Sequence, residues 1–473
     1  MLLPGAPPVR LPEQVDCRGK ETVMTTILIG SLRRLTWVAA VVAAVVGATP
    51  VSAQILSAPT AAVVSVEVNP RSDHSAAPAL RSLIAEALQN NPELRAAAKE
   101  TEAANHRVRP AGALEDPMLE AGLLNVPFQS GRLNREDMTM KMLGLSQKLP
   151  YPGKRALREQ VAAKDAETLN YGLRETNNRV VRDVKLAYFE LALTDETVRL
   201  LKSNRQILEQ FLRIAEGRYA VGQAAQADVL KAQTQLGRMS EELLRMERER
   251  PVMEAELARL LGRRGSASTI AVELPGLRDA GLKLEALQEA ALRERPQLLG
   301  LQSASERSAK TLELARKEAQ PDFDVRFSYG QRERNLDGLP REDMVSITVA
   351  MNLPLWRRDK IEPRIAEAQA LREQTLEMLQ AQQNEVLAKL RQQVAVIEQS
   401  RKSVRLYETD ILPQARLAVE ATLEAYRVSR VDVLMLLDSQ MTLFSYEISR
   451  AKELVNFNKA LAEIELLAGR QMF

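Results

Sequence analysis

The chain has 473 residues, 27% of them charged, with only 21 glycines, 8 phenylalanines, 8 tyrosines and 2 tryptophans. This balance is typical of long helices with solvated faces. A formal net charge of only +3, without a separate basic domain, excludes the usual nucleic-acid-binding classes, so we expect no nucleic-acid partner. The sequence has no Gly-rich phosphate loop, and its two histidines have no metal-ligand spacing. We therefore expect no enzyme: no catalytic residues, no cofactor and no resident metal.

Residues 1–53 are interpreted as a signal peptide, with Met24 as an alternative start. Two arginines at 33–34 precede an apolar run over 35–48, and small residues follow. The alternative is a membrane anchor, but about 14 apolar residues are fewer than the roughly 20 that a spanning helix needs. The only cysteine, Cys17, lies before the cleavage site, so the mature chain has no disulfide and no cysteine to acylate.

The remainder reads as a flexible Ala/Ser/Pro-rich tail, 54–79, followed by two structural repeats, 80–273 and 274–473. Prolines recur with spacings of 25 and 33 residues in both repeats, at Pro92, Pro117 and Pro150 and again at Pro296, Pro321 and Pro354. Further on the offset is 207, as between Tyr219 and Tyr426. These shared spacings indicate a tandem duplication of one unit of about 200 residues.

Each repeat has the same internal order. An opening helix of roughly 30 residues (80–109; 283–318) precedes two strands, which are expected at 118–126 and 138–149 and again at 323–329 and 345–353. In the second repeat apolar and polar residues alternate clearly, whereas 118–126 alternates poorly. The fold class is therefore mostly α with a small β part.

A very long helical stretch ends each repeat. The pattern runs from Gly153 to about Gly217 and from about Lys360 to Val428, which at 1.5 Å per residue is about 100 Å. Apolar residues recur three and four apart along these stretches and again at Leu454, Phe457, Leu461 and Ile464, which predicts coiled-coil packing. Proline has no N–H and disturbs a helix, so Pro251 and Pro413 are candidate helix bends.

Four strands with one apolar face cannot close a barrel, and open sheet edges are not tolerated in lipid. Small membrane barrels begin at about eight strands, so two chains give eight and three give twelve. Helices of about 100 Å must then project from the membrane. The pattern favours an outer-membrane conduit.

The repeated order of elements, together with short motifs, resembles the TolC-like outer-membrane efflux channels over about residues 80–470. The motifs are "LPYPGKR" at 149–155, "ILPQAR" at 411–416, "AYR" followed by "DSQMTL", and the paired endings "LLGR" and "LAGR". The resemblance implies a homotrimer with a twelve-stranded outer-membrane barrel and a long periplasmic helical barrel. "PYPGKR" and "VDVLMLLDSQMTLF" are similar to the branch that serves heavy-metal cation pumps.

Membership implies a passive exit duct in the outer membrane of a Gram-negative bacterium. Its partners would be a periplasmic adaptor (membrane fusion protein), an inner-membrane pump of the resistance–nodulation–division (RND) type, and outer-membrane lipid. A multidrug or type I secretion duct of the same fold is the alternative. Two other classes are less favoured: a non-pore periplasmic adaptor or scaffold should have one helical hairpin and more β structure, and an exported enzyme lacks a site.

In this family each repeat ends in a helical hairpin, and its turn lies at the periplasmic entrance. Here the turns lie in "YAVGQAAQADVL" from Tyr219 and "YRVSRVDVLMLL" from Tyr426. Gly222 suits a left-handed residue that ends the first helix, while Ser429 replaces it in the second copy and leaves that turn's shape open.

Three acidic residues near these turns have two interpretations. Asp228 and Asp432 could be helix N-caps, each contributing about 1 kcal/mol. Alternatively, threefold symmetry gathers Asp432 and Asp438 into rings that attract cations and narrow the entrance. Asp438, twelve residues after Tyr426, is where the family pattern has a gate aspartate. Tyr219, Tyr426 and Arg430 are further entrance candidates. Tyr426 and Arg430 are expected to make inter-helix contacts that hold the entrance closed, and the alternative for either is ordinary surface or seam packing.

Overall fold

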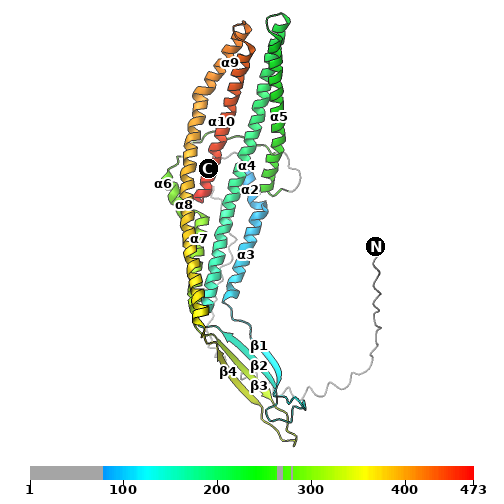
Figure 1. Cartoon of the computed structure of the whole chain (residues 1–473), viewed down its shortest axis with the longest axis vertical. Helices are drawn as coiled ribbons and strands as arrows, with labels where there is room; N and C mark the ends of the chain where they lie inside the picture. Colours follow the sequence, from blue (N-terminus) through cyan, green and yellow to red (C-terminus); the bar gives the residue numbers. More distant parts are fainter. Residues whose placement is uncertain (1–77, 264–269, 279–280, 473) are drawn as a thin grey trace, which may run out of the picture. The chain divides into compact units, whose positions relative to one another are not determined.

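The computed structural model describes residues 78–263, 270–278 and 281–472 (Figure 1). The expected signal peptide and nearly all of the expected tail lie outside these residues. The first repeat contains α2 (Pro78–Asn90), α3 (Pro92–Gly112), β1 (Met118–Leu124), β2 (Met140–Leu149), α4 (Lys154–Ala220) and α5 (Gln226–Leu260). The second contains α6 (Leu284–Glu294), α7 (Pro296–Lys317), β3 (Phe323–Gln331), β4 (Met344–Met351), η1 (Arg357–Ile361), α8 (Glu362–Leu406), η2 (Tyr407–Ile411), α9 (Leu412–Arg427) and α10 (Val433–Ala468).

The single opening helix predicted for each repeat is wrong, because a proline divides it into two. Asn91 and Arg295 precede Pro92 and Pro296 and have extended backbones, with ψ of 122° and 118°. A proline ring disfavours the helical conformation for the residue before it, but fits the first turn of a new helix. Asn91 also caps α3, since its Oδ1 accepts hydrogen bonds from two backbone N–H groups of the first turn.

The four strands form one antiparallel sheet in the order β1-β2-β3-β4. β1 forms a strand even though its sequence alternates poorly, and β2 begins at Met140 rather than at residue 138. The register brings Leu145, Phe327 and Ile347 onto one line across the sheet. The neighbouring line contains Gly144, Ser328 and Ser346, so the two faces differ in polarity.

Helix α4 is the central packing element, since α3, α5, α7 and α10 all contact it. Its predicted apolar seam is confirmed: Val184, Tyr188 and Leu191 are fully buried. The seam of α10 is confirmed as well, with Phe457 and Ile464 fully buried. Because α4 and α10 belong to different repeats, their contact joins the two copies in one helical core.

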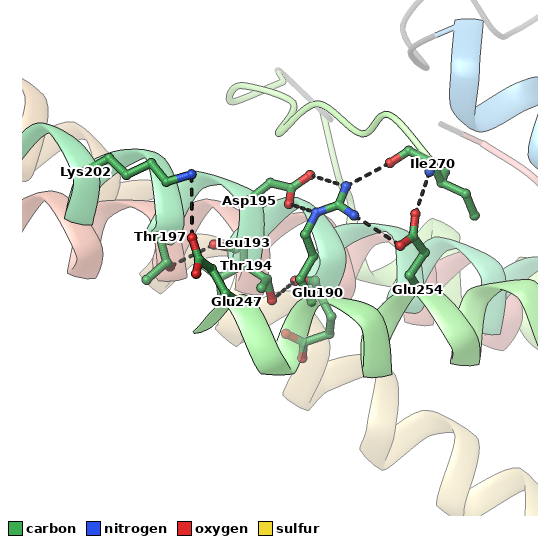
Figure 2. Close-up of polar contacts among 10 residues, drawn as sticks. Glu190, Leu193, Thr194, Asp195, Thr197, Lys202, Glu247, Glu254 and Ile270 are labelled. Atoms are coloured by element: carbon green, nitrogen blue, oxygen red, sulfur yellow. Dashed lines mark hydrogen bonds and ion pairs between the residues drawn. The ribbon is translucent and has the colours of Figure 1, made fainter. Parts of the chain in front are cut away.

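Ion pairs also join the long helices. Arg250 on α5 donates to both carboxylate oxygens of Asp195 on α4, at 2.6 and 3.2 Å, and to Glu254 at 3.1 Å. Asp195, Glu254 and Ile270 converge on this one guanidinium (Figure 2). The Ile270 N–H donates to Glu254 at 2.6 Å. The network therefore joins α4, α5 and residue 270 at the arginine that directly precedes Pro251.

None of the described helices combines the length and the apolar character that crossing a membrane requires.

Candidate functional site

The two hairpin turns have the same backbone hydrogen bonds. In the first, the N–H groups of Gly222 and Gln223 donate to the carbonyls of Tyr219 and Arg218, at 3.0 and 2.8 Å. In the second, the N–H groups of Ser429 and Arg430 donate to the carbonyls of Tyr426 and Ala425, at 3.1 and 2.9 Å. Both pairs make the Schellman arrangement that closes a helix C-terminus. The repeated sequence therefore encodes a repeated turn.

Ser429 adopts the conformation expected of glycine. Its φ is +60°, close to the +70° of Gly222, so the serine changes the residue but not the shape of the turn. A side chain in this left-handed region costs about 1 kcal/mol relative to glycine. The Ser429 hydroxyl is used, however, because it accepts a hydrogen bond from Arg218 of the first repeat.

Arg218 joins the two turns. Its guanidinium lies 4.5 Å from the centre of the Tyr426 ring, and it donates to the Gln223 carbonyl at 3.1 Å and to the Ser429 hydroxyl. A cation over an aromatic face contributes about 0.5–2 kcal/mol, depending on desolvation. Sequence reasoning missed Arg218. The one available signal was an arginine at the helix position where the second repeat has Ala425.

The two repeated tyrosines have different environments. Tyr426 is 1% exposed and packs in the core beneath the turns with Val433 and Leu436, whereas Tyr219 is 48% exposed. Burial raises the pKa of the Tyr426 hydroxyl, and the nearby Arg218 charge offsets only part of that effect. Tyr426 lies against Arg218 of the first repeat, whereas Arg430 is exposed. The inter-helix contacts by which these two residues would hold the entrance closed stay a prediction.

The acidic candidates divide by role. Asp432 is the N-cap of α10, and its Oδ1 accepts from the Met435 N–H at 3.0 Å, as the helix-cap interpretation predicted. The cap predicted for Asp228 is wrong, because Ala225 is the N-cap of α5 and Asp228 lies in its first turn. A carboxylate in the first turn still interacts favourably with the partial positive charge at the helix N-terminus. Asp438 is exposed on α10, with no ion pair among the described residues.

The two prolines differ as well. Pro251 lies inside α5, which continues without interruption to Leu260. Pro413 is the second residue of α9, which directly follows the π-helical turn η2. A π turn is a known way of absorbing a break in the helical hydrogen-bond ladder.

Metal-ligand groups are sparse over the part of the chain that the structure describes. No three His, Cys, Asp or Glu side chains there are arranged to hold a metal ion. Met140 and Met142 lie on the same sheet face as Glu120 and Arg326. Because both methionines lie within a strand, a packing role fits them better than a role as metal ligands.

Comparison with known proteins gives consistent matches. A model of the family described as "Outer membrane efflux protein" matches residues 83–263. The cobalt-zinc-cadmium resistance protein CzcC of Cupriavidus metallidurans is 25% identical over 397 residues, covering 83% of this chain and 90% of CzcC.

Solved channels share the fold. The structure of CusC has a TM-score of 0.70 at 15% identity and covers 83% of this chain and 92% of that one. The outer membrane channel CmeC of Campylobacter jejuni has a TM-score of 0.71 at 14% identity and covers 84% and 87%. The family model thus matches most of the first repeat, and the chain as a whole shares its fold with solved channels.

Proposed function

We propose that the protein is the outer-membrane exit duct of a tripartite efflux system and that its cargo is heavy-metal cations. The observation that carries the proposal is the sheet. It exposes a continuous apolar face that includes Val345, Ile347 and Val349, each 60% exposed or more. Exposed apolar area on this scale marks a lipid or protein contact.

The polar face of the same sheet suits a water-filled lumen. Arg326 on β3 pairs with Glu120 on β1 at 3.1 Å, and the residues beside them include Ser328 and Ser346. Alternation of an apolar outer face with a polar inner face is the pattern of membrane β-barrels.

The sheet edges support a homotrimer. Within one chain β1 and β4 each have a single neighbour, so each leaves a row of backbone groups unpaired. Lipid cannot satisfy those groups, so neighbouring chains must pair the edges. Three chains give a barrel of twelve strands, within the size range of outer-membrane barrels.

The proposed cargo rests on CzcC, which is named for resistance to cobalt, zinc and cadmium. We place the entrance of the duct at the paired hairpin turns, where a periplasmic adaptor and an inner-membrane RND-type pump would deliver the cations. In a trimer, exposed Asp438 would form a ring of three carboxylates, which raises the local density of cations.

The entrance can be tested separately from the cargo. In planar bilayers, Asp438→Asn should weaken the block of conductance by divalent cations. Glu377→Gln removes an exposed carboxylate on α8 and should leave the block unchanged. Equal block in the wild type and in Asp438→Asn would contradict a role of this carboxylate at the entrance.

The cargo is tested by growth of a deletion strain, with and without complementation, on cobalt, zinc, cadmium, copper and silver and on dyes and antibiotics. We expect sensitivity confined to the metals and restored by the wild-type gene. Sensitivity to organic compounds instead would support a multidrug duct of the same fold and would contradict the proposed cargo.

A further inference from the structure

A cavity lies where the helices meet the sheet. It has a volume of about 320 Å³, and its lining includes the start of α4, the residues around β3 and β4, and the start of α8. Its base is fixed by hydrogen bonds between the strand ends, since Asp322 precedes β3, Asn352 follows β4, and the Asp322 N–H donates to the Asn352 side chain. Neither the family nor the proposed duct assigns this cavity a role.

The cavity has excess positive charge. Four cationic side chains line it, Lys154, Arg158, Lys360 and Arg364, against two carboxylates, those of Glu318 and Asp322.

Each carboxylate already has a cationic partner. Lys154 pairs with Asp322 at 2.8 Å, and Arg364 pairs with Glu318 at 3.1 Å. Burial alone would raise the pKa of Asp322, but its hydrogen bonds from Lys154 and from the Tyr151 N–H keep the pKa below its usual range. The carboxylate is therefore ionised and committed to Lys154. Arg158 and Lys360 form no salt bridge with any residue that the structure describes, although the charge of Arg158 also helps to lower the pKa of Asp322.

The rim of the cavity is apolar and uncovered. Leu353, Leu355 and Trp356 are 64%, 76% and 73% exposed. The π-helical turn η1 follows directly, and the Lys360 N–H donates to the Trp356 carbonyl at 3.0 Å. Lys360 and Trp356 therefore belong to one local unit that presents a charge beside an exposed aromatic ring.

We propose that this cavity binds the headgroup phosphate of an anionic phospholipid through Arg158 and Lys360, with Leu355 and Trp356 against the acyl chains. The proposal rests on the proposed function, because it needs the sheet to lie in a bilayer. The cavity would then be at the membrane boundary nearest the helices, where tryptophan is enriched and each basic residue attracts anionic lipid. A small soluble anion has no apolar part that could contact the rim.

Trp356 provides the probe, since the sequence has only one other tryptophan, Trp37. The full chain with Trp37→Phe is reconstituted in phosphatidylcholine vesicles. A small fraction of the lipid is dibrominated, either as phosphatidylglycerol or as phosphatidylcholine. We expect brominated phosphatidylglycerol to quench Trp356 with about three- to tenfold higher relative affinity. Arg158→Gln combined with Lys360→Gln should reduce this ratio to about one.

The control is Arg372→Gln, which removes an exposed cation from α8 outside the cavity and should preserve the ratio. Quenching equal for both lipids in the wild type overturns the headgroup site while leaving membrane insertion intact. Loss of the preference on adding inorganic phosphate assigns the cavity to a free anion and also overturns the proposal. No quenching by either lipid contradicts both this inference and the proposed function.

Discussion

Placing an arginine on either face of β4 should have opposite consequences. Ile347 is 66% exposed on the apolar face, opposite Phe327 in the register, whereas its neighbour Ser346 lies on the polar face opposite Ser328. If the apolar face contacts lipid, Ile347→Arg moves a charge into hydrocarbon. The same substitution at Ser346 moves it into water. The pair thus introduces the same side chain at neighbouring positions on opposite faces of the sheet.

The structure sets the magnitude. Ile347 is the fourth of the eight residues of β4 and is therefore near mid-strand. An arginine on the lipid face of a membrane barrel costs about 2–4 kcal/mol near the bilayer midplane. Three copies would raise the cost to about 6–12 kcal/mol per trimer. Ser346→Arg has no such cost, and we expect its effect to stay within about 1 kcal/mol.

Two assays measure the effect. The first is the amount of heat-resistant oligomer recovered from the outer membrane, and the second is the guanidinium midpoint after refolding into vesicles. Ile347→Arg should nearly abolish the oligomer and lower the midpoint, while Ser346→Arg should match the wild type. Equal behaviour of the two variants, or greater damage from Ser346→Arg, would refute the assignment of the faces.

Three further predictions concern the helices. Gly222→Ala should destabilise the first turn by about 1 kcal/mol because φ is +70°, whereas Gly237→Ala inside α5 should stabilise the protein by about 0.5–1 kcal/mol; thermal unfolding separates the two signs. Arg218→Ala should speed amide exchange at 219–223 and 426–430 about tenfold, and Arg218→Lys should only partly restore protection because lysine lacks the planar fork; unchanged exchange would remove Arg218 from its joining role. Lys185→Met leaves its buried partner Glu465 charged and should cost about 3–5 kcal/mol, while Lys185→Met with Glu465→Met should recover most of that loss in urea unfolding.

Most of the fold could be predicted from the repeated sequence pattern. Local patterns determined β3, β4 and the seams of α4 and α10, since burial on one face imposes its period on the sequence. The division at Pro92 and Pro296 was also visible locally, because a proline restricts the residue before it. β1 was harder to predict from the sequence, since both of its faces carry apolar residues. It is stabilised as a strand by its pairing with β2.

The contacts at the turns could not be predicted in the same way. Arg218 and Tyr426 are far apart in sequence, and nothing in the pattern of one repeat refers to a side chain of the other. The left-handed conformation of Ser429 is also non-local in part, because its hydroxyl is held by Arg218. The predicted Asp228 cap was wrong because the helix begins three residues earlier than expected. Its N-cap is Ala225, which has no side chain that can cap the helix.

The most direct test of the duct is a crosslink between the unpaired sheet edges. In a chain with Cys17→Ser, Ser346→Cys on β4 is combined in turn with cysteine at Met118, Glu120, Gly122 or Leu124, the β1 positions on the same face. After oxidation in the outer membrane and denaturation without reductant, the account predicts for at least one pair a ladder that ends at three chains. A ladder that continues beyond three, or bands from monomer alone in every pair, would contradict a closed barrel of three chains.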